Sequence, residues 1–258
     1  MRAVFWELDF FSRPQLDANQ KKIWELLICN SDRSWEYRQI CPPDQVNSEW
    51  LASQLHAAIA TTAPPLKVRF FRATMANMIT RGCKAADLIP QASRRLFTLR
   101  QWLQECYPEQ ADPLPLILNP QPILQTPPDA LVGDRWLIAS LTVTDLSEAD
   151  QWQIDFGERF PVNLPPTLEI PGVIIYSRRA LPLAAWMSGV DPVFLTCERN
   201  YLVLDAGADS RWRLAKVDPR LRVKAEEFEQ AKPEGVHFLA IQTKAEDQEF
   251  AGFWLLKS

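Results

Sequence analysis

The sequence predicts a mixed α/β protein built from two domains that are joined by a proline-rich connector. Segments of alternating apolar and polar residues, typical of strands, occur in both halves of the chain together with segments of helical spacing. The 258 residues are enough for two modest domains. Seven of the 21 prolines fall within residues 108–128, which predicts a semi-rigid extended segment. The expected organisation is therefore a domain at 1–107, a linker at 108–128 and a domain at 129–258.

The first half of the chain shows the strand and helix patterns in clear succession. Strands are expected at 4–11, 22–29, 35–40 and 66–71. Helices are expected at 47–60, 73–87 and 93–106. Asn47 and Ser93 are suitable N-cap residues for the first and last of these helices. The resulting order β-β-β-α-β-α-α suits an RNase H-like domain, which is an analogy at the level of fold only.

The second half predicts a larger share of strands. They are expected at 136–143, 173–176, 193–197, 200–205, 211–217, 236–243 and 250–256. Helices are expected at 147–153, 181–188 and 225–232, with Gly189 and Pro233 as stop signals. Alternation in the last strand predicts that Trp254 faces a core while Phe253 and Leu255 face the other side. The order of the strands in the sheets stays open.

Composition argues against several classes of protein. The five cysteines include no C-x-x-C pair, and there are only two histidines, so neither a metal site nor any other cofactor is expected. No apolar run approaches the roughly 20 residues of a membrane span. The first residues do not resemble a signal or transit segment, which indicates a protein of the bacterial cytoplasm or a processed form. These features predict a cytoplasmic protein with reduced thiols, and they leave peripheral attachment to a membrane open.

Positive charge is concentrated in two segments, although the formal net charge is −4. Residues 67–100 contain eight basic residues and one acid, and residues 211–224 contain six basic residues and one acid. The rest of the chain is therefore strongly acidic. Segregation of this kind predicts a basic face on an acidic body, which suits binding of nucleic acid.

The candidate RNA-binding residues come from these two segments. They are Arg69, Arg72, Arg94, Arg95 and Arg100 in the first, and Arg211, Trp212, Arg213 and Arg222 in the second. A guanidinium group fits phosphate oxygens, and an indole between two arginines could stack on an unpaired base. The alternative is that the arginines form a solvated face or ion pairs, and that Trp212 points into the core.

Three acids predict a competing function. Glu7 and Asp9 share one face of the first strand, and Glu25 lies on its expected partner. Carboxylates on strands can bind a divalent metal that activates water, which would make the chain a metal-dependent nuclease. The plainer interpretation is charge pairing with Lys21, Lys22 or Arg13 on an exposed face of the sheet. We assign no catalytic residue and expect the protein not to be an enzyme.

The two ends of the chain together resemble one family. The start reads Trp6-Glu7-Leu8-Asp9-Phe10-Phe11-Ser12-Arg13-Pro14, and the end reads Trp254-Leu255-Leu256 before the last two residues. Both are similar to the translation activators of cyanobacteria and chloroplasts that are required for synthesis of the photosystem I reaction centre. The resemblance implies an RNA-binding protein that acts on the 5′ untranslated region of a photosystem mRNA. It also implies that Trp254, Leu255 and Leu256 support RNA binding, whereas their apolar character favours closure of a core.

These observations together predict a non-enzymatic, RNA-binding protein that promotes translation of photosystem mRNA and photosystem I biogenesis. The expected partner is single-stranded RNA, with translation machinery or thylakoid-associated proteins as further candidates. Besides the nuclease, a second alternative is a photosystem assembly factor that binds protein through a tryptophan-rich surface. That alternative requires an exposed apolar patch instead of a basic face.

Overall fold

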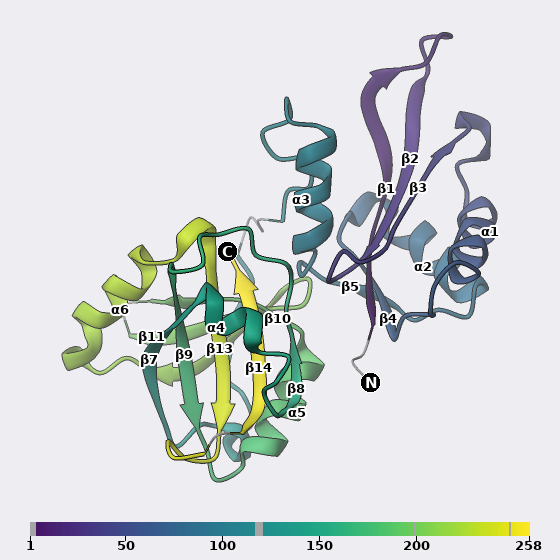
Figure 1. The fold of residues 1–258 in the computed structure, drawn as a ribbon. Helices are drawn as coiled ribbons and strands as arrows, with labels where there is room; N and C mark the ends of the chain where they lie inside the picture. Colours follow the sequence, from purple (N-terminus) through teal and green to yellow (C-terminus); the bar gives the residue numbers. More distant parts are fainter. Residues whose placement is uncertain (1–3, 117–120, 199, 248) are drawn as a thin grey trace. The chain divides into compact units, whose positions relative to one another are not determined.

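The computed structural model describes residues 4–116, 121–198, 200–247 and 249–258. The chain folds into two compact units, Met1–Ile117 and Leu118–Ser258. Each unit contains a mixed sheet and helices (Figure 1), so the predicted mixed α/β class is confirmed. The division falls inside the proline-rich segment: residues 108–116 belong to the first unit, and residues 121–128 belong to the second.

The first unit is organised around a five-stranded sheet in the order β3-β2-β1-β4-β5. Its strands are β1 (Phe5–Leu16), β2 (Lys22–Asn30), β3 (Glu36–Cys41), β4 (Lys67–Phe70) and β5 (Pro90–Ala92). The first three strands are antiparallel, and β4 and β5 run parallel to β1. The sequence did not predict β5, which is three residues long and contains a proline. The analogy with RNase H stays a prediction.

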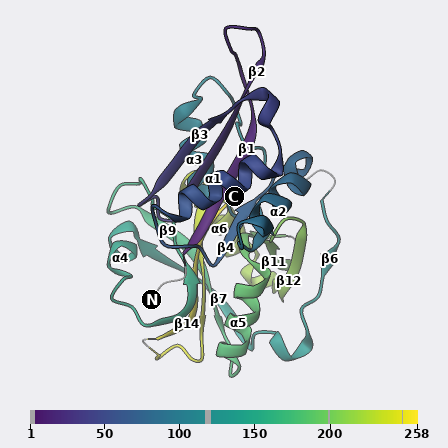
Figure 2. The same ribbon diagram turned by 90° about the vertical axis from the view of Figure 1, so that its right-hand side faces the viewer.

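Helices cover both faces of this sheet. They are α1 (Ser48–Ile59), α2 (Ala76–Ala85) and α3 (Phe97–Cys106). α1 and α2 pack on one face against Trp6, Leu8 and Phe10 of β1, and Figure 2 shows them in front of the strands. α3 packs on the opposite face, together with the buried Leu114 and Leu116 of the proline-rich segment. Both faces of β1 are therefore buried, and its second face carries the carboxylates Glu7 and Asp9.

The second unit contains two mixed sheets. One has the order β10-β11-β12-β6, and the other has the order β7-β9-β13-β14-β8. The strands of the first are β6 (Leu124–Gln125), β10 (Pro192–Cys197), β11 (Tyr201–Ala206) and β12 (Ser210–Lys216). Those of the second are β7 (Arg135–Thr142), β8 (Ile154–Glu158), β9 (Glu169–Tyr176), β13 (Val236–Gln242) and β14 (Phe250–Lys257). The helices are α4 (Val143–Glu148), α5 (Ala180–Val190) and α6 (Arg222–Gln230).

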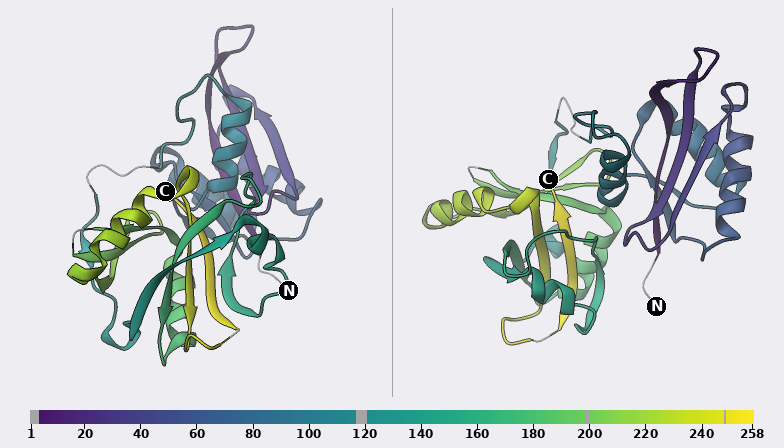
Figure 3. Two further views of the ribbon diagram at one scale, coloured as in Figure 1. Left: turned by 60° about the vertical axis from the view of Figure 1, so that its left-hand side comes forward. Right: turned by 45° about the horizontal axis from the view of Figure 1, so that its top comes forward.

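The last strand lies inside its sheet and is buried on both faces. β14 pairs with β13 and β8, and Figure 3 shows the yellow strands β13 and β14 side by side. Trp254 and Leu256 join the core that includes α5 and the four-stranded sheet, whereas Phe253 and Leu255 join a second core next to α4. The expectation that only one set of these side chains faces a core is therefore wrong, because elements of the unit cover both faces of the sheet.

Gly252 provides the space that the indole of Trp254 needs. A Cβ atom at position 252 would lie 2.5 Å from the Trp254 ring and 3.1 Å from the Cβ of Ala184 on α5. The indole therefore covers its own strand at the one position that carries no side chain. This explains the Gly-Phe-Trp order at the end of the chain.

Several helices begin at other residues than the sequence predicted, and for two of them the polar residues near the start give the reason. α4 begins at Val143 instead of 147, because Thr142 and Asp145 form a reciprocal capping box. α3 begins at Phe97 instead of 93, because the Ser93 hydroxyl accepts a hydrogen bond from the Arg95 backbone N–H in a turn. Ser93 therefore does not cap the helix.

Candidate nucleic-acid interface

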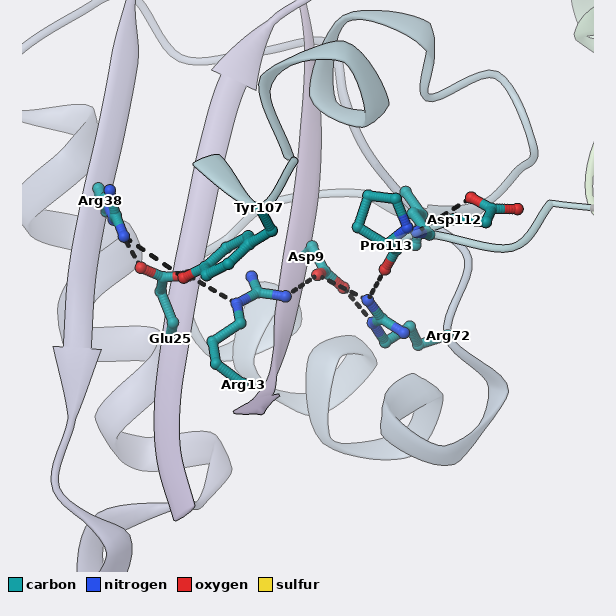
Figure 4. A network of polar contacts seen from close by, with 9 residues as sticks. Asp9, Arg13, Glu25, Arg38, Arg72, Tyr107, Asp112 and Pro113 are labelled. Atoms are coloured by element: carbon teal, nitrogen blue, oxygen red, sulfur yellow. Dashed lines mark hydrogen bonds and ion pairs between the residues drawn. The ribbon is translucent and has the colours of Figure 1, made fainter. Parts of the chain in front are cut away.

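A buried network of arginines and carboxylates dominates the second face of the first sheet. Arg13 lies between Glu25 and Asp9, as Figure 4 shows: its Nε is 2.6 Å from Glu25 Oε2, and its Nη1 is 3.1 Å from Asp9 Oδ2. Asp9 and Glu25 are next to each other on this face because the β1–β2 pairing places Phe10 opposite Leu26. All three charged side chains are almost fully buried.

The network reaches beyond the sheet to the residues that follow α3. Arg72 donates to Asp9 Oδ1 from Nε at 2.6 Å and to the Pro113 carbonyl from Nη2 at 2.7 Å. Tyr107 donates its hydroxyl to Glu25 Oε2 at 2.6 Å. These bonds hold residues 107–116 on the sheet, which is why this part of the predicted linker belongs to the folded unit.

Hydrogen bonds and ion pairs within the network compensate for the burial of its charged groups. Burial raises the pKa of Glu25, but hydrogen bonds from Tyr107, Arg13 and Arg38 outweigh it, so the pKa lies below its ordinary value. Burial and the bond to Glu25 raise the pKa of Tyr107 to about 12. Arg13, Arg38 and Arg72 face only two carboxylates, and the side chain of Arg38 is 49% exposed. The surplus positive charge is therefore at the surface.

The three acids of the nuclease alternative are all engaged by groups of the protein itself. Glu7 accepts a hydrogen bond from the Leu99 backbone N–H at 2.8 Å, in the first turn of α3, where a carboxylate also complements the helix dipole. Asp9 and Glu25 are bridged by the guanidinium group of Arg13. Among the described residues no group of three or more His, Cys, Asp or Glu side chains is placed to hold a metal ion. The predicted pairing of Asp9 and Glu25 with Arg13 is present. The expectation of an exposed sheet face is wrong, because α3 and the residues that follow it cover this face and bury the acids.

The arginines that the sequence singled out in the first unit do not form one open surface. Arg69, Arg94 and Arg95 are each only 2% exposed. Arg72 donates hydrogen bonds to Asp9 and to the Pro113 carbonyl. Arg100 is partly exposed, and its Nε lies 3.4 Å from Asp112 Oδ1. A charge reversal at Arg94 and Arg95 would therefore bury two acids and perturb the fold, instead of testing RNA contact alone.

In the second unit the Arg211-Trp212-Arg213 stretch lies on β12. Arg211 is buried and pairs with Glu198 and Asp205, and it donates to Gln121 Oε1 at 2.8 Å. Trp212 is half-buried and contacts the ring of Trp186 edge to face. Arg213 donates to Thr126 Oγ1 at 2.7 Å and lies over the Tyr201 ring. This strand therefore fixes residues 121–126 of the proline-rich segment on the second unit.

The surface of the second unit is basic just beyond this strand. Four basic side chains between residues 216 and 224 are exposed: Lys216, Arg220, Arg222 and Lys224. We name these four residues the basic segment. It spans the end of β12, a short turn and the first residues of α6. A pocket of about 470 Å³ adjoins it, lined by Cys197, Glu198, Val217, Arg222, Ala225, Glu226, Glu229 and Gln230.

The C-terminal tripeptide is not at the surface. Trp254, Leu255 and Leu256 are at most 2% exposed, and their backbone pairs with β13. Their role in this fold is therefore packing. Any influence of these three residues on RNA binding would act through the structure of the second unit.

Sequence patterns did not indicate the role of His237. This residue is fully buried on β13, where Nε2 accepts from the Leu195 N–H at 2.8 Å and Nδ1 lies 2.8 Å from the Gly235 carbonyl. It thereby links the two sheets of the second unit. Burial, with a smaller contribution from the charge of Lys232, lowers the pKa of His237 to about 3. The only sequence signal was a histidine within an otherwise apolar strand.

Acid should destabilise the second unit through His237. Because the folded pKa lies near 3 and the ordinary value is 6.5, the unfolded chain binds the proton first as the pH falls below about 6.5. The free energy of unfolding should decrease by about 2 kcal/mol between pH 7 and pH 5 from this group. Urea denaturation at both pH values should show this decrease.

His237→Gln is the matching control for that measurement. Its amide oxygen can still accept from the Leu195 N–H, but the side chain does not titrate. The variant should lose most of the pH dependence in this range. An unchanged pH dependence in the variant would show that another group is responsible.

Comparison with known proteins places these features in a family. Residues 5–106 match the family described as "RNA-binding protein Tab2/Atab2 N terminal", and residues 114–257 match "RNA-binding protein Tab2/Atab2, C-terminal domain". The chain is 35% identical to "Protein TAB2 homolog, chloroplastic" of Zea mays, over 97% of this chain and 70% of that protein. It is 34% identical to the protein of the same description in Arabidopsis thaliana, over 97% of this chain and 74% of that one.

Among solved structures, the catalytic core domain of HTLV-2 integrase aligns with 43% of this chain and 75% of that one. The identity is 15% and the TM-score is 0.29, so this likeness supports no conclusion. No helix among the described residues has the length and apolar character needed to span a membrane. Both halves of the chain match the family along nearly their whole length, and the chain therefore belongs to the Tab2/Atab2 family of RNA-binding proteins.

Proposed function

We propose that this protein binds single-stranded RNA and promotes translation of a photosystem reaction-centre mRNA, acting on its 5′ untranslated region and contributing to photosystem I biogenesis. The family membership of both halves of the chain supports this proposal most directly. The terminal sequences, which resemble translation activators for the photosystem I reaction centre, supply the link to this class of mRNA. We further propose that the protein works in the cytoplasm and without catalysis.

The second unit offers the better RNA contact surface. Its basic segment presents four exposed cations. In the first unit, by contrast, Arg13 and Arg72 pair with buried carboxylates, and Arg69, Arg94 and Arg95 are themselves buried. Arg213 and Trp212 lie just before this segment on the same strand and are partly exposed. We propose that phosphates bind the basic segment and that Arg211 supports the fold of the second unit, on which this segment lies. The buried arginines of the first unit would support the fold of that unit only. The phosphate groups of single-stranded RNA attract exposed Lys and Arg side chains, and this attraction does not require a deep site.

Neutralising two members of the basic segment should weaken RNA binding. We expect Arg220→Gln with Lys224→Gln to reduce the slope of log K against log salt concentration by roughly 1.4, because each lost phosphate contact on single strands contributes about 0.7. Fluorescence anisotropy with a photosystem leader RNA over a salt series measures this slope. Both side chains are exposed, so the melting temperature should hardly change.

The matched control removes the same charge elsewhere. Lys21→Gln with Lys22→Gln changes two exposed lysines in the β1–β2 hairpin of the first unit and should leave the slope nearly unchanged. Equal effects of the two double variants would mean that binding follows net charge only. A wild-type chain that shows no affinity for RNA would contradict the proposed function itself.

A further inference from the structure

We propose that the pocket next to α6 binds an unpaired guanine base of the RNA, an inference that rests on the proposed function. The pocket has a volume of about 470 Å³, within the roughly 300–1,000 Å³ typical of small-molecule sites. It lies between the end of β10, residue 217 and one face of α6, because Arg222, Glu226, Glu229 and Gln230 follow each other at helical spacing.

Two charged side chains at the pocket are open to a ligand. Among the residues that the structure describes, the side chains of Arg222 and Glu226 are engaged in no hydrogen bond or ion pair, and both are exposed. They are four residues apart on α6 and thus lie one turn from each other. The pocket therefore presents a free guanidinium fork and a free carboxylate on the same side.

The other two carboxylates of the pocket are already satisfied. Glu198 pairs with Arg211, and Glu229 pairs with Lys232 at 2.7 Å and accepts from the Cys197 backbone N–H at 2.5 Å. Their presence makes the pocket unfavourable for a phosphate group, which would meet several carboxylates. A neutral ligand with both donors and acceptors suits this lining better than an anion does.

Guanine is the RNA base whose edges match this arrangement. Its N1–H and N2–H₂ groups are neighbouring donors that a carboxylate such as Glu226 can accept, while O6 and N7 are acceptors that suit an arginine fork. Val217 and Ala225 line the same pocket and offer apolar contact to the ring. Single-stranded RNA is commonly recognised through bases that are splayed out in this way.

The basic segment would hold the chain on either side of such a base. Arg222 belongs both to the pocket and to the basic segment, and Arg220 and Lys224 are its exposed neighbours outside the pocket lining. Phosphate contact and base recognition would then occur on adjacent residues. Phosphates would supply affinity, and the pocket would supply a preference for one base.

The test compares short oligouridylates that contain one central guanosine, inosine or adenosine, with fluorescence anisotropy of the full chain as the readout. Inosine lacks only the 2-amino donor. The wild-type chain should bind the guanosine oligomer roughly tenfold more tightly than the adenosine oligomer, with inosine in between. Glu226→Gln should remove most of this preference while affinity for the plain oligouridylate stays.

Glu227→Gln is the matched control, because Glu227 is the exposed neighbour of Glu226 on α6 and does not line the pocket. It should keep the guanosine preference. Equal affinities of the wild-type chain for all three oligomers, or equal behaviour of the two variants, would overturn the guanine site and leave RNA binding intact. Absence of binding to every oligomer and to the leader RNA would instead overturn the proposed function.

Discussion

Replacing Trp254 by alanine is expected to lower the free energy of unfolding of the second unit by about 3–5 kcal/mol, the usual range for a buried aromatic residue. The indole is 2% exposed and lies in the core formed with α5 and the four-stranded sheet. Its removal would leave a cavity directly above Gly252, which cannot fill it. Because a whole domain is stable by about 5–15 kcal/mol, this loss should be visible as a lower urea midpoint.

RNA affinity separates packing from direct contact in the same variant. If Trp254 only packs, the RNA affinity of the remaining folded molecules should equal that of the wild-type chain. Lys257→Ala, at the partly exposed end of the same strand, should change neither stability nor affinity by much. A Trp254→Ala variant with unchanged unfolding but weaker RNA binding would contradict the packed role and favour base stacking.

Local patterns predicted most elements of the fold but not the partners of charged residues. Alternation along 4–11 correctly indicated a strand, and helical spacing correctly indicated α1. The same patterns treat Arg72 as a surface cation, because its partner Asp9 is 63 residues away along the chain. Nothing near Arg72 in the sequence indicates that the two meet.

Very short elements and pockets were also beyond prediction from the sequence. β5 and β6 contain three and two residues, too few for any periodicity, and they exist because a neighbouring strand offers free hydrogen-bonding groups. The pocket next to α6 brings together Cys197 and Arg222, which only the tertiary fold places close to each other. The basic residues of 216–224 are exposed, as the concentration of charge in the sequence suggested, and their role in RNA binding stays a prediction.

Replacing Arg13 by methionine should destabilise the first unit by about 3–5 kcal/mol, because it removes the cation between two buried carboxylates. Asp9 would keep Arg72, and Glu25 would keep Arg38 and Tyr107, but the most deeply buried guanidinium group of the network, which lies between the two carboxylates, would be lost. Arg38→Met is the matched control. Its side chain is 49% exposed, so its removal should cost at most about 1 kcal/mol. Urea denaturation of both variants gives the comparison.

The pH dependence of the Arg13→Met variant tests the same explanation. In the wild-type chain the pKa of Glu25 lies below its ordinary value of 4.5. The stability that ionised Glu25 contributes is therefore present above about pH 4.5, and it is lost as the pH falls through the pKa of Glu25 in the folded protein. Without Arg13 the pKa of Glu25 should rise, and acid unfolding should begin at a higher pH.

A second substitution then distinguishes uncompensated charge from lost packing. If the buried carboxylate is what destabilises the Arg13→Met variant, adding Glu25→Gln should restore part of the stability, because the neutral amide costs less to bury without its partner. If the destabilisation by Arg13→Met and that by Glu25→Gln simply add in the double variant, Arg13 contributes through the packing of its side chain and not through its charge. In that case the two buried carboxylates would be held mainly by Arg72, Arg38 and Tyr107.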